Sequence, residues 1–140
     1  MPFVRISVFE SSPAARNAAI ADAVYQAMRE TIDIPEGDRF ILVTRHGRDE
    51  LYVDANFMGL ERSERFVLVH ITLSQGRSVE KKQALYARIA ERLHAAIGVS
   101  TDDVMTVLTE NTFTDWSFGK GVAQFVLNPP AWISRPGAGN

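Results

Sequence analysis

One unit of strand, helix and strand occurs twice in the chain, and this repeat restricts the fold more than any other feature. Apolar and polar residues alternate over two short runs, which is the period of a half-buried strand, and each run is followed by a helical pattern and a further apolar run. The first unit comprises residues 3–9, 13–31 and 39–44, and the second comprises 66–73, 79–97 and 104–109. Phe3 and Phe66 are 63 residues apart and Asp38 and Asp103 are 65 apart. We therefore expect a tandem β-α-β duplication with a two-residue difference between its halves.

Local signals define the ends of these elements. Ser11 or Ser12 can cap the first helix, with Pro13 at its first position. Residues 34–38 and 98–103 read as turns because they combine proline or glycine with aspartate. The second helix carries an apolar residue at every fourth position, at Leu85, Ile89, Leu93 and Ile97, while Lys81, Lys82, Arg88 and Glu91 are expected to face water.

Two such units specify an α+β fold. A β-α-β crossover is right-handed and its strands are parallel, so two units side by side form a four-stranded mixed sheet with two helices on one face. The other face is left uncovered, although Phe66 and Leu68 would place apolar area on it together with His70 and Thr72. We expect that face to pack against other subunits in a ring-like homo-oligomer.

The remaining segments are less regular. Between the two units we expect a short strand at residues 51–53 within a polar loop, and after residue 109 a glycine-bearing turn and a last strand. The interpretation is one domain over residues 1–128, with repeats at about 2–45 and 65–127, followed by a tail at 129–140.

Composition excludes several classes of function. The chain has 140 residues, of which 46% are apolar, and its formal charge of −2 offers no basic face for nucleic acid. It contains no cysteine, and its three histidines lie 24 residues apart without a metal-binding motif. No basic leader and no apolar run of about 20 residues is present, so we expect a cytoplasmic protein that does not enter a membrane.

Several short motifs carry a family resemblance. They are Pro2 after the initiator methionine, the segment PEGDR, the turn SQGRS before KKQ, and ENTFTDWSFGKG after the second unit. In their order and spacing these motifs resemble the tautomerase superfamily. The second half is similar to 4-oxalocrotonate tautomerase, and nearly the whole chain resembles the malonate semialdehyde decarboxylase branch, whose chains contain two fused units. The resemblance implies a tautomerase (MIF-like) fold, a homotrimer without cofactor or metal, and a small carboxylate as substrate.

The resemblance also assigns roles to two residues. It implies that Met1 is removed and that the secondary amine of Pro2 is the catalytic group, whereas in many cytosolic proteins a proline at position 2 only gives a stable N-terminus. The amine would act as a base if burial or a cation lowers its pKa, and as an acid if a carboxylate beside it preserves the cation. Arg77 matches the arginine that holds the substrate carboxylate, a task suited to two parallel hydrogen bonds near a helix N-terminus.

The remaining candidates have alternative readings. Asp38 matches an acidic residue that orients water near the proline, yet an aspartate after glycine is equally a simple turn former. Trp116 and Phe118 either form an apolar lid that dries the pocket or pack between subunits. Gln75 stands where the decarboxylase has a further arginine, so one of the two cations that polarise and hold a keto acid is missing.

Three functions follow from these assignments. The first is a cofactor-free tautomerase that acts on a small 2-oxo or enol carboxylic acid, with Pro2 as general base. The second is a decarboxylase or hydratase in which cationic Pro2 is the acid and Asp38 activates water or steers the substrate. The third is a trimeric binding protein without turnover, because a fold does not fix a function.

Overall fold

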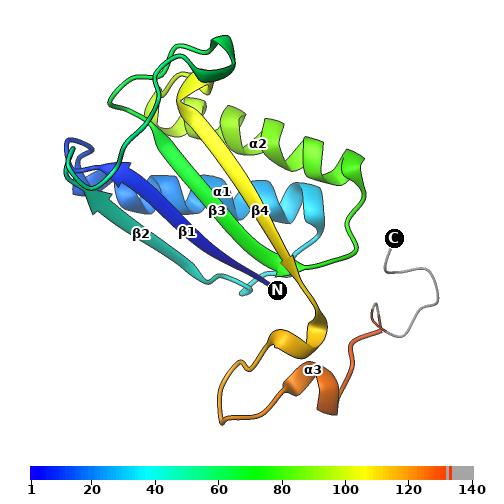
Figure 1. Cartoon of the computed structure of the whole chain (residues 1–140). Coiled ribbons are helices and arrows are strands. Elements are labelled where there is room, and N and C mark those ends of the chain that lie inside the picture. The colour runs from blue at the N-terminus through cyan, green and yellow to red at the C-terminus, as the bar shows by residue number, and fades with distance from the viewer. Residues whose placement is uncertain (132, 134–140) are drawn as a thin grey trace.

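The computed structural model of the protein describes residues 1–131 and 133. It contains one four-stranded sheet with the two long helices on one of its faces, and a segment after the last strand that extends away from the sheet (Figure 1). The elements in chain order are β1 Pro2–Phe9, α1 Asn17–Ile32, β2 Ile41–His46, β3 Val67–Ser74, α2 Val79–Ile97, β4 Val104–Asn111 and α3 Gln124–Leu127. The expected fold class, with two β-α-β units in a mixed sheet, is confirmed.

The strand order is β2-β1-β3-β4, so the two units meet at the central pair. Within each unit the strands are parallel, and β1 and β3 are antiparallel. The units share one offset of 65 residues: Pro2 and Val67 begin β1 and β3, and Ile32 and Ile97 end the two helices. The expected two-residue difference between the halves is therefore wrong, because Phe66 precedes β3 and is not the counterpart of Phe3.

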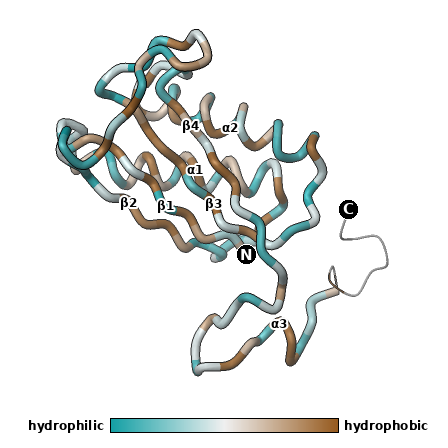
Figure 2. The backbone as a smooth tube through the Cα atoms, in the orientation of Figure 1, coloured by the Kyte–Doolittle hydropathy of each residue, from teal (hydrophilic) through white to brown (hydrophobic). Residues whose placement is uncertain are grey.

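The core lies between the sheet and the helices. Alternate residues of β1 and β3 are buried against α1 and α2, and Figure 2 shows hydrophobic residues along both strands. Of the four residues expected in the buried stripe of α2, Ile97 is only partly buried against the core, and Leu85, Ile89 and Leu93 are buried. Their counterparts 65 residues earlier are Ile20, Val24 and Met28, which are buried on α1. Each half thus supplies the same stripe to one shared core.

The opposite face of the sheet is open in the single chain. Leu42 on β2 is 41% exposed and Met105 on β4 is 44% exposed, and on β3 the ring of His70 meets Thr109 with 2.8 Å between Nε2 and Oγ1. Phe66, which we expected on this face, is instead buried.

Two expected strands do not form. Residues 51–53 have no neighbouring strand, because the amides of Glu50 and Leu51 bond back to the carbonyl of Gly47 in a local turn. After β4, residues 119–121 all adopt positive φ, and the side chain of Gln124 binds the amide of Phe118 and the carbonyl of Gly119. These residues form the glycine-bearing turn that was expected, and the last strand is absent because Gln124–Leu127 form the short helix α3 instead. The tail predicted at 129–140 lies largely outside the described residues.

Candidate active site

A cavity of about 490 Å³ lies at the edge of the sheet where β1 begins. Strand pairing brings three segments to this edge. Because β1 and β3 are antiparallel, Pro2 pairs with Leu73, next to the turn that carries Arg77. Because β1 and β2 are parallel, the turn before β2 brings Asp38 to the same place. The lining includes Met1, Asp33, Asp38, Gln75, Arg77, Lys81 and Phe125.

The amino terminus faces a buried carboxylate in this cavity. The nitrogen of Met1 is 3.9 Å from Oδ2 of Asp38, which is 5% exposed, and neither oxygen of Asp38 has a hydrogen-bond partner among the described residues. Burial lowers the pKa of the amine, Asp38 opposes that shift, and Arg77 adds to it. Burial also raises the pKa of Asp38 against the pull of the amine and of Arg77. Pro2 is buried and does not line the cavity while Met1 is present.

Arg77 lies where β3 passes into α2. Its Nη1 donates to the carbonyl of Ser74 at 2.6 Å, which fixes the side chain beside the cavity. Burial lowers its pKa, while Glu110, Asp38 and Asp33 act in the opposite direction. Ser78 caps α2 by accepting from the amide of Lys81, so the helix begins with its positive end next to the guanidinium. This arrangement suits a carboxylate.

The expected aromatic pair belongs to a cluster of three rings. Trp116 stacks on Phe118 with ring centroids 5.8 Å apart, and Phe118 meets Phe125 edge-on at 4.8 Å. Only Phe125 lines the cavity, so the cluster reaches the site through a residue that the sequence did not single out. Nε1 of Trp116 also donates to Asn111 at the end of β4, which ties the cluster to the sheet.

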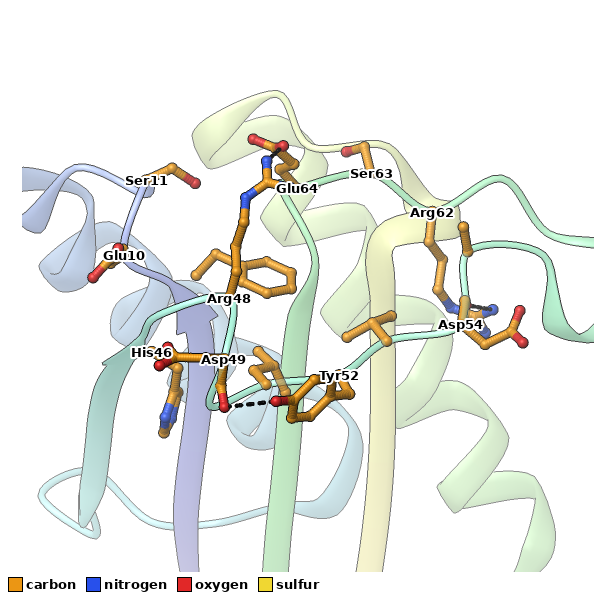
Figure 3. Close-up of a pocket in the computed structure, with 14 residues that line it drawn as sticks. Glu10, Ser11, His46, Arg48, Asp49, Tyr52, Asp54, Arg62, Ser63 and Glu64 are labelled. Carbon is orange, nitrogen blue, oxygen red and sulfur yellow. Dashed lines mark hydrogen bonds and ion pairs between the residues drawn. The ribbon is translucent and has the colours of Figure 1, made fainter.

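A larger cavity, of about 1160 Å³, lies at the other end of β1 (Figure 3). Both of its arginines already have partners: Arg48 pairs with Glu64, and Arg62 donates to the carbonyls of Asp54 and Phe57. The hydroxyl of Tyr52 donates to the carbonyl of Asp49. The smaller cavity is the better candidate because it combines a terminal amine, a guanidinium and a buried carboxylate that has no hydrogen-bond partner among the described residues.

Sequence reasoning missed three residues of the site: Asp33, Lys81 and Phe125. Lys81 is exposed to water as expected, and its ammonium also binds Asp33 at the mouth of the cavity. Its place on the first turn of α2, directly after the loop that carries Arg77, was an available signal. Asp33 and Phe125 gave no comparable signal, since their positions depend on how distant segments pack.

The fold is α+β, and the candidate site lies at the amino-terminal end of β1. A family model described as tautomerase enzyme matches residues 38–119, and the chain belongs to this family. The probable tautomerase YusQ of Bacillus subtilis (strain 168) is 36% identical over 126 residues, which cover 90% of this chain and 99% of that protein. The probable tautomerase YrdN of the same organism is 32% identical over 126 residues, covering 90% and 97%.

Solved structures place the chain within the superfamily more narrowly. FG41 malonate semialdehyde decarboxylase, inhibited by 3-bromopropiolate, is 39% identical with a TM-score of 0.85, covering 92% of this chain and 98% of that one. A second malonate semialdehyde decarboxylase is 31% identical with a TM-score of 0.84, covering 89% and 96%. A fused 4-OT that forms a symmetric trimer shares the fold at 22% identity and a TM-score of 0.74, covering 90% and 98%. The expected assignment to the malonate semialdehyde decarboxylase branch is confirmed.

No helix within residues 1–131 and 133 is long and apolar enough to cross a membrane. In the same part of the chain, no three histidine or acidic side chains are grouped as a metal ion would require.

Proposed function

We propose that the protein is a tautomerase that acts without a cofactor on a small 2-oxo or enol carboxylic acid. The observation that carries this proposal is the meeting of the amino-terminal end of β1, buried Asp38 and Arg77 at one cavity. Pro2 is the general base, Arg77 holds the carboxylate of the substrate, and the aromatic cluster of Trp116, Phe118 and Phe125 limits access of water.

The proposal requires removal of Met1. Met1 lines the cavity, and its carbonyl carbon is bonded to the ring nitrogen of Pro2, which as an amide cannot take up a proton. Cleavage of that bond leaves a secondary amine at the wall of the cavity. Burial there favours the neutral form of an amine, as it does for the terminal amine of Met1.

Proton transfer follows from this arrangement. Neutral Pro2 takes a proton from the enol hydroxyl, or from the carbon beside the carbonyl, and returns it at the other position of the same molecule. Arg77 binds the carboxylate through two parallel hydrogen bonds, which orients the substrate against the amine. Gln75 lies at the rim and offers an amide to the carbonyl or enol oxygen of the substrate.

Enol–ketone interconversion of phenylpyruvate tests the assignment. Pro2→Ala should lower kcat by about 100-fold or more, because it replaces the cyclic secondary amine that acts as base. Arg77→Gln should mainly raise KM, while Arg88→Gln on the outer part of α2 should leave both constants unchanged. Protein whose intact mass shows retained Met1 should be inactive. Full activity in the Pro2 variant or in the Met1-retaining protein would contradict the proposal.

A second candidate is a decarboxylase or hydratase, and one observation favours it. The carboxylate of Asp38 is buried without a hydrogen-bond partner among residues 1–131 and 133, so a cationic amine would be its natural counter-ion. Pro2 would then be an acid with a raised pKa. An NMR titration of the Pro2 nitrogen separates the two functions: a lowered pKa supports the tautomerase, and a raised pKa with carbon dioxide release from malonate semialdehyde supports the alternative.

We also propose that the protein is a cytoplasmic homotrimer that uses the open face of its sheet for assembly. The exposed apolar residues on β2 and β4 support this, and the trimeric fused 4-OT shares the fold. The absence of cysteine agrees with a reducing compartment. The proposal includes neither nucleic acid nor membrane as a partner.

A further inference from the structure

We propose that Lys81 is a positioning residue that keeps the carboxylate of Asp33 away from Arg77, so that Arg77 stays available to the carboxylate of the substrate. The inference rests on the proposed role of Arg77. All three side chains line the same cavity, and Lys81 contacts neither the amine nor Asp38 in the interactions that the structure shows.

Asp33 occupies a position that the second unit gives to glycine. It ends α1 with φ of 56°, in the left-handed region, and its counterpart 65 residues later is Gly98, which ends α2 with φ of 69°. Glycine is the usual residue at such a helix end, although aspartate tolerates the conformation better than most. The first unit therefore carries a carboxylate at the mouth of the cavity where the second unit carries no side chain.

A free carboxylate here would compete with the substrate. Asp33 is near enough to Arg77 to act against the lowering of its pKa by burial. A guanidinium binds any carboxylate in the same forked geometry, and an attached carboxylate has a high effective concentration. Unrestrained, Asp33 would occupy the group that the substrate needs.

Lys81 provides the restraint. Lys81 is on the first turn of α2, four residues after Arg77. Its Nζ lies 2.8 Å from Oδ2 of Asp33. The ammonium thus directs the carboxylate to the outer side of the cavity, where both side chains are at least half exposed. The pair joins the end of α1 to the start of α2 and leaves the guanidinium without an acidic hydrogen-bond partner among the described residues.

Steady-state kinetics with phenylpyruvate and an NMR titration with propionate, a carboxylate that does not react, test the inference. Lys81→Gln should raise KM and the dissociation constant of propionate by about two- to fivefold, the upper part of the range for an exposed ion pair, with kcat unchanged. Lys81→Arg should retain the wild-type values. Adding Asp33→Asn to Lys81→Gln should restore both constants, because the competing carboxylate is then absent.

A matched double variant excludes a simple effect of net charge. Glu80→Gln with Lys81→Gln restores the same charge on the first turn of α2 but leaves Asp33 in place, so its KM should remain raised. Equal recovery in the two double variants, or no recovery with Asp33→Asn, would overturn the inference. Failure of the proposed function is recognised separately: Arg77→Gln would then leave the affinity for propionate unchanged.

Discussion

Asp38 and Asp103 occupy equivalent positions in the two units, yet their surroundings differ. Asp103 is 2% exposed and accepts hydrogen bonds from the amide and hydroxyl of Ser63, at 2.6 Å and 2.7 Å. Asp38 is buried to a similar degree but has no hydrogen-bond partner among the described residues, and only the charges of the terminal amine and of Arg77 act on it. The second unit thus uses its aspartate to anchor the linker before β3, while the first exposes its carboxylate to the cavity without a hydrogen bond.

The two aspartates should respond in opposite ways to the same substitution. Burial raises the pKa of Asp38, so the folded protein holds the proton of this carboxyl more tightly than the unfolded chain does. The free energy of unfolding therefore falls as the pH rises above the pKa that Asp38 has in the unfolded chain. Asp38→Asn should therefore raise stability at pH 7 by about 1 kcal/mol while lowering kcat, and Asp103→Asn should lower stability by about 1–3 kcal/mol.

Urea unfolding at pH 7 and phenylpyruvate kinetics on both variants check this pair. Destabilisation by Asp38→Asn would show that its carboxylate has a structural partner in the folded chain, and the simple turn-former reading of Asp38 would then be preferred.

At the scale of elements, α1 and α2 are joined on their outer side by a charged cluster. Glu30 of α1 accepts from Arg88 and Arg92 of α2, and Arg88 also pairs with Glu91. Hydrogen bonds from Arg92 and then from Arg88 lower the pKa of Glu30 to about 2. The two helices are thus held together by ion pairs on their outer side and by their buried apolar stripes on the side that faces the sheet.

The cluster predicts a pH dependence. The pKa of Glu30 is lower in the folded protein than in the unfolded chain, where it is near 4.5. Ionised Glu30 therefore stabilises the fold at pH values above 4.5, and this stabilisation is lost as the pH falls toward 2. Glu30→Gln should lower Tm at pH 7, and the difference from the wild type should shrink between pH 4.5 and 2. Calorimetry over this range measures it, and a difference independent of pH would assign the effect to packing.

At the scale of the whole molecule, the single chain leaves apolar side chains exposed on the open face of the sheet. Met105→Lys would place a charge among apolar residues of this face and should convert a trimer to monomers, whereas Tyr86→Lys on the outer side of α2 should not. Size-exclusion chromatography with light scattering gives the mass of each variant. A wild-type protein that is already monomeric would contradict the proposed assembly.

Most of the residues expected at the candidate site could be identified from the sequence alone. Pro2, Asp38, Gln75 and Arg77 were all singled out, and three of them line the cavity, while Pro2 is buried behind the lining. The motifs around these residues are local, so they could be recognised before the fold was known. The role of the lining residues in catalysis stays a prediction.

The sequence by itself determined the two β-α-β units, most of the buried stripe of α2 and the turns that close the units, because periodicity and turn residues are recorded locally along the chain. It misplaced strands at 51–53 and after β4, since a strand needs a neighbouring edge and neither segment finds one. The expected serine cap of the first helix does not form, since α1 begins at Asn17 without a side-chain cap. Only the tertiary structure decided that Asp33, Lys81 and Phe125 meet beside Arg77. The physical reason is that packing joins residues far apart in sequence, and a residue's own neighbours in the chain do not record its partners across the fold.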